Sequence, residues 1–249
     1  MQRILGYMRK AIQEFDMIKD GDRIAVGVSG GKDSLCLLAG LSLLRRFIGI
    51  DYSLTAITLD PMFNGQPGSY DAVNQLCMAH GIEYRLIRTH IGEIVFDIRK
   101  EPNPCSLCAR LRRGALHDAA KEAGCNVVAL GHHYNDVVET FMMNLFIEGR
   151  VGCFSPKSYL SRKELYMIRP LVFAPETAIR SAVKRLEVEV VKSVCPADGA
   201  TKREEMKEFI KDMEYRDKGF TDRLFGALRR SGVDGWGFKD KKAGELGSE

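Results

Sequence analysis

Several common features are absent from this sequence, and their absence narrows the class of protein. Residues 1–18 carry charged side chains among apolar ones, as in an amphipathic helix, so they do not resemble a signal peptide. No run of about 18 uncharged apolar residues occurs, so no membrane span is predicted. Internal repeats and RNA-binding module motifs are also missing. We therefore expect a cytoplasmic protein without a membrane partner.

The composition is that of an ordinary globular chain. Its 249 residues are 45% hydrophobic, which suffices for one large domain or for a domain with an appendage. The formal net charge of +4 permits a nucleic-acid partner without arguing for one. Seven cysteines without a secretory signal imply a reducing compartment. There, buried, catalytic or metal-binding thiols are favoured over disulfides.

Short apolar segments alternate with longer segments of helical periodicity. The expected strands are 24–28, 54–59, 84–88, 127–130 and 166–168. The expected helices are 3–17, 35–47, 70–80, 106–123 and 135–148. This alternation predicts an α/β fold with a parallel five-stranded sheet and helices on both faces. We divide the chain into a main domain (1–175), a C-terminal helical segment (176–235) and a disordered tail (236–249).

A glycine-rich loop joins the first expected strand to the next helix, with the sequence Ser29-Gly30-Gly31-Lys32-Asp33-Ser34. Glycines let backbone N–H groups approach phosphate oxygens, and a helix N-terminus adds partial positive charge. Lys32 supplies a full charge. The loop is not a Walker A sequence, because Asp33 follows the lysine where serine or threonine is required. Its composition and position predict a phosphate-binding loop.

Two other segments follow expected strands in the same way. Asp60 ends the second strand, and residues 131–136 follow the fourth. Ligands of parallel sheets bind outside the carboxyl ends of the strands. We therefore expect these segments and the 29–34 loop to converge on one crevice. Of the adjacent His132 and His133, one is expected to contact nucleotide or to orient a loop, with a packing role equally open.

A second group of candidate residues is formed by cysteines. Cys105 and Cys108 open a helix, whose N-terminus lowers a thiol pKa, and nearby arginines act in the same direction. The CxxC spacing alone fits a redox disulfide, zinc or an iron–sulfur site. Cys195, far along the chain, can complete a three-cysteine set. The remaining cysteines are expected to be small buried hydrophobes: Cys36, Cys77, Cys125 and Cys153.

The 29–34 loop resembles the signature of the PP-loop ATP pyrophosphatases. The resemblance implies a Rossmann-like five-stranded parallel sheet, and an enzyme that cleaves ATP between its α- and β-phosphates and adenylates a carbonyl oxygen. It gives ATP contacts to 29–34, Gly131 and His132. It also gives Asp60 and Asp136 roles toward the nucleotide or Mg²⁺.

Three further segments resemble the tRNA 2-thiocytidine synthetase family within that group: residues 105–114, Gly131 to Asp136, and 168–171. The resemblance covers roughly residues 3–225. It implies a [4Fe–4S] cluster held by Cys105, Cys108 and Cys195, with one iron open to sulfide or a persulfide. The implied catalytic residues are Cys105, Cys108, Arg112 and Asp136. The implied partners are tRNA, a sulfur donor such as a cysteine desulfurase persulfide or sulfide, and a second copy in a homodimer.

The sequence departs from the family at three places. Tyr134 and Asn135 replace the usual arginine and first aspartate after the two histidines. Lys192 stands where the family often has another cysteine, which leaves Cys195 alone. The segment 196–199 also differs. These changes leave ATP use untouched but bear on which base is modified.

The sequence thus predicts ATP-dependent tRNA thiolation, in which the C2 oxygen of a cytidine in the anticodon loop is adenylated and replaced by sulfur. Three alternatives stay open: a thiolase acting on uridine, a PP-loop amide-forming ligase, and a non-catalytic iron–sulfur or nucleotide-binding protein. For the basic run from Lys202 to Arg216, interleaved with acidic residues, a solvated helix is favoured over an RNA-binding face. His80, His90 and His117 carry no motif and are expected to be structural or solvated.

Overall fold

The computed structural model describes residues 1–100, 104–191, 195–196 and 202–237. In this part of the chain, one sheet contains β1 (Asp22–Gly27), β2 (Tyr52–Asp60), β3 (Glu83–Arg88), β4 (Val127–Ala129), β5 (Lys157–Leu160) and β6 (Leu165–Ile168). The strand order is β3-β2-β1-β4-β6-β5. All neighbouring pairs are parallel except the antiparallel β5–β6 pair. The α/β fold and its five parallel strands are confirmed, and an antiparallel edge strand is added to them.

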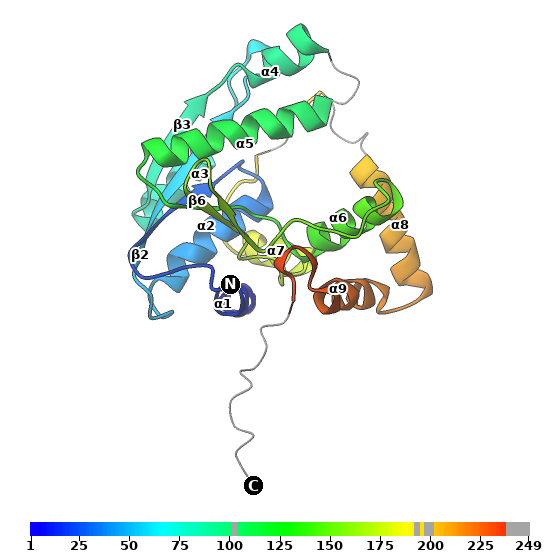
Figure 1. Cartoon of the computed structure of the whole chain (residues 1–249). Coiled ribbons are helices and arrows are strands. Elements are labelled where there is room, and N and C mark those ends of the chain that lie inside the picture. Colours follow the sequence, from blue (N-terminus) through cyan, green and yellow to red (C-terminus); the bar gives the residue numbers. More distant parts are fainter. Residues whose placement is uncertain (101–103, 192–194, 197–201, 238–249) are drawn as a thin grey trace.

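The longer helices follow the expected segments closely (Figure 1). They are α1 (Gln2–Glu14), α2 (Lys32–Leu44), α3 (Asp71–His80), α5 (Pro104–Glu122), α6 (Tyr134–Phe146), α7 (Glu176–Lys184), α8 (Lys202–Arg216) and α9 (Phe220–Ser231). Shorter turns lie at Phe63–Gly65, α4 (Ile91–Glu93), Ile94–Arg99 and Val233–Gly235. The α4 turn and the π-helical segment that follows it were not predicted.

Apolar side chains cover both faces of the sheet, because successive strand residues point to opposite sides. On one face, Ile24 and Val26 of β1 join a core built mainly with α1, α2, α3 and α7. On the other, Ala25 belongs to a core with Leu116 and Ala120 of α5. Figure 1 shows α5 crossing one side of the sheet, with α1, α2 and α7 on the opposite side. This sandwich holds the carboxyl ends of the strands in fixed positions.

The winding of the chain reverses between β1 and β4. From β1 the chain passes through α2 to β2 and β3, and then returns along α5 to β4 on the other side of β1. Loops that leave two such neighbouring strands run in opposite directions, which opens a crevice at their carboxyl ends. The loops after β1 and β4 are residues 28–31 and 130–133, so the fold places the crevice between two of the expected site segments.

The C-terminal helices end on a buried tryptophan. Trp236 is fully buried, and its Nε1 donates to the Phe154 carbonyl oxygen at 2.8 Å. Its ring lies edge-on to Phe15 and Phe225, with centroids 5.8 and 5.6 Å away. Since Trp236 joins α1 and α9 in one core, the tail expected from residue 236 cannot include this residue. Residues 238–249 lie outside the described part of the chain.

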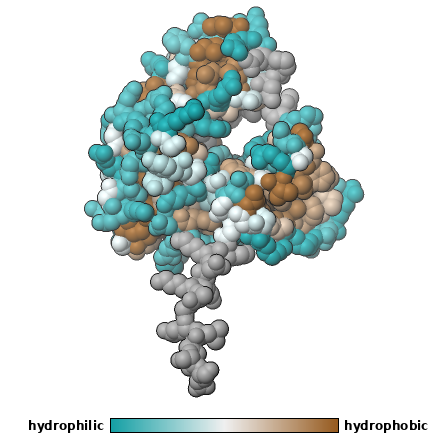
Figure 2. Space-filling view, viewed as in Figure 1, coloured by the Kyte–Doolittle hydropathy of each residue, from teal (hydrophilic) through white to brown (hydrophobic). Residues whose placement is uncertain are grey.

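Exposed apolar side chains gather where α6 and α8 pack together (Figure 2). The rings of Phe146 and Phe209 lie 6.0 Å apart, and Leu145 and Ile147 are exposed beside them. Among the described helices, none is long and apolar enough to cross a membrane.

Replacing Trp236 by alanine should remove both its hydrogen bond and its packing against the rings of Phe15, Phe154 and Phe225. We expect Trp236→Ala to lower the free energy of unfolding by about 3–5 kcal/mol, as for other buried aromatic truncations. Chemical denaturation measures the change. The matched control is Tyr215→Ala, since the Tyr215 side chain is exposed and its loss should cost less than about 0.5 kcal/mol. Equal stabilities for the two variants would contradict this placement of Trp236.

Candidate active site

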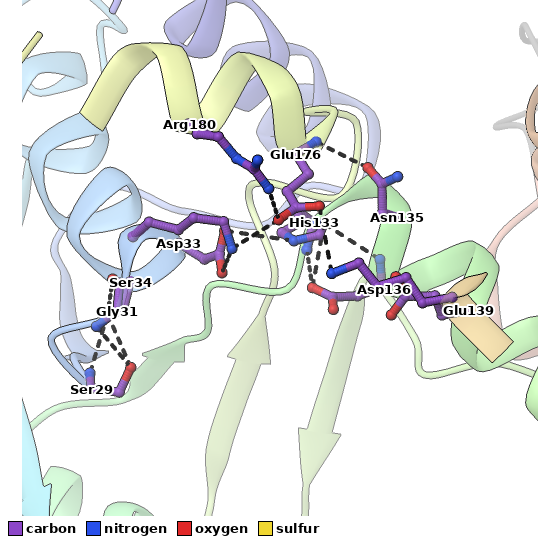
Figure 3. Close-up of polar contacts among 12 residues, drawn as sticks. Ser29, Gly31, Asp33, Ser34, His133, Asn135, Asp136, Glu139, Glu176 and Arg180 are labelled. Carbon is purple, nitrogen blue, oxygen red and sulfur yellow. Dashed lines mark hydrogen bonds and ion pairs between the residues drawn. The ribbon is translucent and has the colours of Figure 1, made fainter. Parts of the chain in front are cut away.

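The loop between β1 and α2 is closed by its two serines (Figure 3). The Ser34 hydroxyl donates to the Gly31 carbonyl at 2.9 Å and accepts the Ser29 backbone N–H at 3.2 Å. The Ser29 hydroxyl accepts the Gly31 N–H at 3.3 Å. Gly30 has a φ of +79°, a conformation that favours glycine. The loop is therefore preformed at the N-terminus of a buried helix, as an anion site requires.

Lys32 is held between two carboxylates. Its Nζ lies 3.1 Å from Asp33 Oδ2 and 3.1 Å from Glu176 Oε1, at the start of α7. Burial would lower the pKa of Lys32, but the two carboxylates outweigh it and raise that pKa. At Glu176, burial alone would raise the pKa, but hydrogen bonds from Lys32 and Arg180 outweigh it and lower the pKa to about 2. Glu176 stays ionised and fixes the lysine at the loop.

The start of α6 is organised by His133. The His133 N–H donates to Asp136 Oδ2 at 2.9 Å, and His133 Nδ1 accepts the Asp136 N–H at 3.4 Å, which forms a capping box. His133 Nε2 lies 3.6 Å from Asp33 Oδ1. His133 thus orients Asp136 and links it to the phosphate loop.

The neighbouring histidine has a different environment. His132 is stacked on Phe154, with ring centroids 4.8 Å apart, and its Nδ1 accepts a hydrogen bond from Arg169 Nε at 3.1 Å. Burial, followed by the charge of Arg169, lowers the pKa of His132 to about 4, so the ring is neutral. His132 lines a cavity beside Ser29 and Gly131, in keeping with the nucleotide contact predicted for it.

The two residues that depart from the family pattern both contact C-terminal helices. Asn135 Oδ1 accepts the backbone N–H of Glu176 at 2.9 Å and so caps α7. The Tyr134 hydroxyl donates to Asp222 of α9 at 2.6 Å. In this chain these positions therefore serve helix docking. Lys192, the third departure, lies outside the described residues.

Arg203 of α8 also reaches the site. Its Nη1 lies 3.2 Å from Asp136 Oδ1 and 3.3 Å from Glu139 Oε2, and its Nη2 donates to the Thr140 hydroxyl at 3.1 Å. Burial, and then repulsion by Asp136, raises the pKa of Glu139 to about 7 despite the opposing charge of Arg203. The sequence predicts a solvated helix here. Arg203 does not fit this prediction, because its side chain contacts the candidate site and anchors α8 to it.

Asp60 is buried and shapes the following loop. Its Oδ1 accepts the Met62 N–H at 3.0 Å, and its Oδ2 accepts the Gly68 N–H at 2.9 Å. Both oxygens are thus engaged with residues 61–68, and Asp60 lines a cavity with Ser29 and Gly31. Its predicted contact with nucleotide or metal stays a prediction.

Val191, which precedes Cys195 by four residues, packs on the phosphate loop. The Val191 N–H donates to the Gly30 carbonyl at 3.0 Å, and a Cβ on Gly30 would lie 2.5 Å from the Val191 side chain. A residue larger than glycine at position 30 would displace Val191. Val191 therefore ties the end of the described segment, four residues before Cys195, to the nucleotide loop.

Cys105 and Cys195 both influence the pKa of Cys108, although Cys195 is far from the other two in sequence. Burial raises the pKa of Cys108; Arg112 lowers it, and Cys195 and Cys105 raise it further. The lowered pKa expected for Cys108 is therefore wrong, because burial outweighs the arginine. Within the described ranges, no three His, Cys, Asp or Glu side chains are arranged as they would be around a metal ion. Cys36, Cys77, Cys125 and Cys153 are buried and free, as expected.

Two cavities meet at the candidate site and share Ser29 and Arg112. The first, of about 410 Å³, extends from Ser34 and Asp136 into an apolar region under α5. The second, of about 650 Å³, is lined by Asp60, by the loop that runs from Asp60 to Tyr70, and by Val191. Of the predicted residues, this arrangement brings together the 29–34 loop, Asp60, Arg112, 131–132 and Asp136. The sequence drew attention to residues 168–171 and to the basic run that begins at Lys202, but it did not predict the contacts that Arg169, Glu176 and Arg203 make here, because their partners are distant in the chain.

Comparison with known proteins agrees with this geometry. The model of the PP-loop domain family matches residues 5–212. A tRNA-cytidine(32) 2-sulfurtransferase of Pelobacter propionicus is 41% identical over 230 residues, which cover 91% of this chain and 85% of that protein. The enzyme of the same name from Citrifermentans bemidjiense is 39% identical over 216 residues, covering 85% and 84%.

A solved structure is also similar. The U34-tRNA thiolase NcsA from Methanococcus maripaludis, determined with its [4Fe-4S] cluster, superposes with a TM-score of 0.72 at 28% identity. The match covers 91% of this chain and 77% of that one. From the phosphate loop, the fold and these matches together, the chain belongs to the PP-loop family and to the branch of it that contains the tRNA-cytidine(32) 2-sulfurtransferases.

Proposed function

We propose that this protein is an ATP-dependent tRNA sulfurtransferase that converts a cytidine to 2-thiocytidine. The observation that carries the proposal is the meeting of two cavities at Ser29 and Arg112, one at the phosphate loop and one lined by Val191, which contacts that loop and precedes Cys195 by four residues. Cytidine is favoured over uridine because the named cytidine enzymes are 39–41% identical to the chain, whereas the uridine thiolase is 28% identical.

ATP binding is assigned to the 29–34 loop, with Gly131 and His132 beside it. Its backbone N–H groups and Lys32 would hold the phosphates. Because Lys32 is 3.1 Å from Glu176 Oε1, the phosphates compete with this carboxylate for the lysine. Mg²⁺ fits the carboxylate oxygens of Asp136 or Asp60, the ligand type that this ion prefers.

The first chemical step is attack by the C2 oxygen of the base on the α-phosphorus of ATP, with release of pyrophosphate. In the second step a sulfide sulfur attacks C2, the C2–O bond breaks and AMP leaves, so that C2=S replaces C2=O. Arg112 lines both cavities and would stabilise negative charge that develops in either step. Asp136, fixed by His133 and Arg203, would position metal or base.

The cysteines fit a [4Fe–4S] cluster in donor type and number. Cysteine thiolates are the usual ligands of such clusters, and Cys105 and Cys195 both act on the pKa of Cys108. With three protein ligands, the cluster would offer one open iron to sulfur. Zinc and a disulfide are the alternatives for the same thiols. The cluster of the structurally similar thiolase favours iron.

The proposed partners are tRNA and a sulfur donor that delivers sulfide or a persulfide, and the proposed place of reaction is the cytoplasm. A looped-out base would enter between the cavities, since proteins read RNA sequence mainly at unstacked bases. The homodimer stays a prediction.

The proposal is tested by mass spectrometry of tRNA nucleosides from a strain that lacks the gene. We expect 2-thiocytidine to disappear and to return with the wild-type gene. Loss of 2-thiouridine would assign the enzyme to uridine instead. An unchanged set of thionucleosides would exclude tRNA thiolation.

Replacement of Lys32 should impair nucleotide chemistry. We expect Lys32→Ala to lower kcat/KM for tRNA-dependent pyrophosphate release by about 100-fold, the effect of losing one preorganised charge contact. Lys163→Ala is the matched control, because Lys163 forms an exposed ion pair with Asp118 away from the cavities. Pyrophosphate release at the wild-type rate in Lys32→Ala would contradict the assignment of the loop.

Replacement of Cys195 should separate metal binding from ATP binding. We expect Cys195→Ser, purified without oxygen, to contain less iron and acid-labile sulfide than the wild type while binding ATP equally well. Cys125→Ala is the control, since Cys125 is buried under α5 and should leave the iron content unchanged. A full iron complement in Cys195→Ser would remove this residue from the ligand set.

A further inference from the structure

His117 occupies an unexpected position in the first cavity. It lies on α5, nine residues after Cys108, and is 7% exposed. The cavity that it lines also contains Ser29, Asp33 and Ser34 of the phosphate loop. The sequence indicated a structural or solvated histidine, but the fold instead places this one in the wall of the candidate nucleotide site.

The Nε2 atom of His117 is buried and has no hydrogen-bond partner among the described residues. Buried polar atoms are nearly always hydrogen-bonded, and an unpaired one costs about 1–3 kcal/mol of stability. A histidine that serves only packing has no reason to carry this cost. An atom of a bound molecule is the natural partner for it.

The imidazole is neutral, because burial, and then the charge of Arg113, lowers the pKa of His117. A neutral ring offers one donor and one acceptor nitrogen. The walls nearby are apolar and come from Ile57, Leu59, Leu116 and Leu130. A neutral polar atom in an apolar wall suits an uncharged flat ring better than a phosphate or a metal ion.

The two ends of the cavity match the two ends of a nucleotide. If the phosphates of ATP bind the 29–34 loop, the apolar end of the first cavity is free to hold the base of the nucleotide. The second cavity, lined by Asp60 and Val191, is then free for the RNA. We propose that His117 Nε2 hydrogen-bonds the nucleobase of ATP. This inference rests on the proposed ATP-dependent function and adds a nucleobase-binding residue to it.

The test compares wild type, His117→Phe and His117→Gln, each as the full chain with Mg²⁺, by calorimetric titration. Three nucleotides are used: ATP, purine riboside triphosphate, which lacks the N6 amine, and 7-deaza-ATP, which lacks N7. We expect the Kd of His117→Phe for ATP to rise about tenfold, the effect of one lost hydrogen bond that is well formed. Wild type should bind one analogue about tenfold more weakly than ATP, and that analogue identifies the atom contacted. In His117→Phe this difference should vanish, and His117→Gln should restore part of it.

If His117 binds the nucleobase, phenylalanine removes a nitrogen that is unpaired without nucleotide, so the Tm of His117→Phe without nucleotide should be unchanged or higher. A purely structural role of His117 predicts a lower Tm instead. A lower Tm with an unchanged Kd and unchanged discrimination would overturn the inference while leaving the proposed function intact. Failure of wild type to bind ATP at all would overturn both. The control is His80→Phe, because His80 bonds Ser42 outside either cavity and its loss should not change ATP binding.

Discussion

The close contact between the loops after β1 and β4 is the constraint on which the site depends. A Cβ on Gly131 would lie 3.1–3.2 Å from backbone atoms of Asp33 and Ser34, so any larger residue would crowd the two loops and push them apart. The contact places His133 Nε2 within 3.6 Å of Asp33 and, through the capping box, fixes Asp136. The reversal of strand order at β1 and β4 brings these loops together, and the glycine lets them touch.

A set of carboxylates connects this contact to the C-terminal helices. The Glu176 carboxylate forms an ion pair with Lys32, and the Glu176 backbone N–H donates to Asn135. The Asp136 carboxylate forms an ion pair with Arg203. The helices α7 and α8 thus reach the nucleotide loop through charged groups that phosphate or metal can displace. The two carboxyl groups differ in protonation: burial raises the pKa of Glu139 to about 7, whereas the hydrogen bonds from Lys32 and Arg180 outweigh burial at Glu176 and keep it ionised.

The sequence predicted what local patterns determine. The buried strands, the helix starts and the 29–34 loop have short-range signals, and the structure agrees with them. It did not reveal β5, because four residues on an exposed edge carry little apolar pattern. Nor did it predict the sign of the pKa change at Cys108, which depends on burial by residues distant in sequence. The contacts of Arg169, Glu176 and Arg203 were not predicted for the same reason: only the fold brings these residues to residues 131–136 and Lys32.

The departures at residues 134 and 135 gain a physical meaning from the structure. An arginine–aspartate pair there would present charge, whereas Tyr134 and Asn135 use their polar atoms on Asp222 and on the N-terminus of α7. In this chain the two residues therefore help to dock α7 and α9, while Arg112 and Asp136 line the first cavity.

The central claim is that nucleotide activation and sulfur delivery take place in one site. A single-turnover reaction without oxygen tests it most directly, with tRNA, ATP and sulfide, by measuring pyrophosphate and 2-thiocytidine together. The account predicts equal amounts of the two products from wild type, and pyrophosphate without 2-thiocytidine from Cys195→Ser. Formation of 2-thiocytidine by Cys195→Ser in the wild-type amount, or by wild type without pyrophosphate, would contradict it.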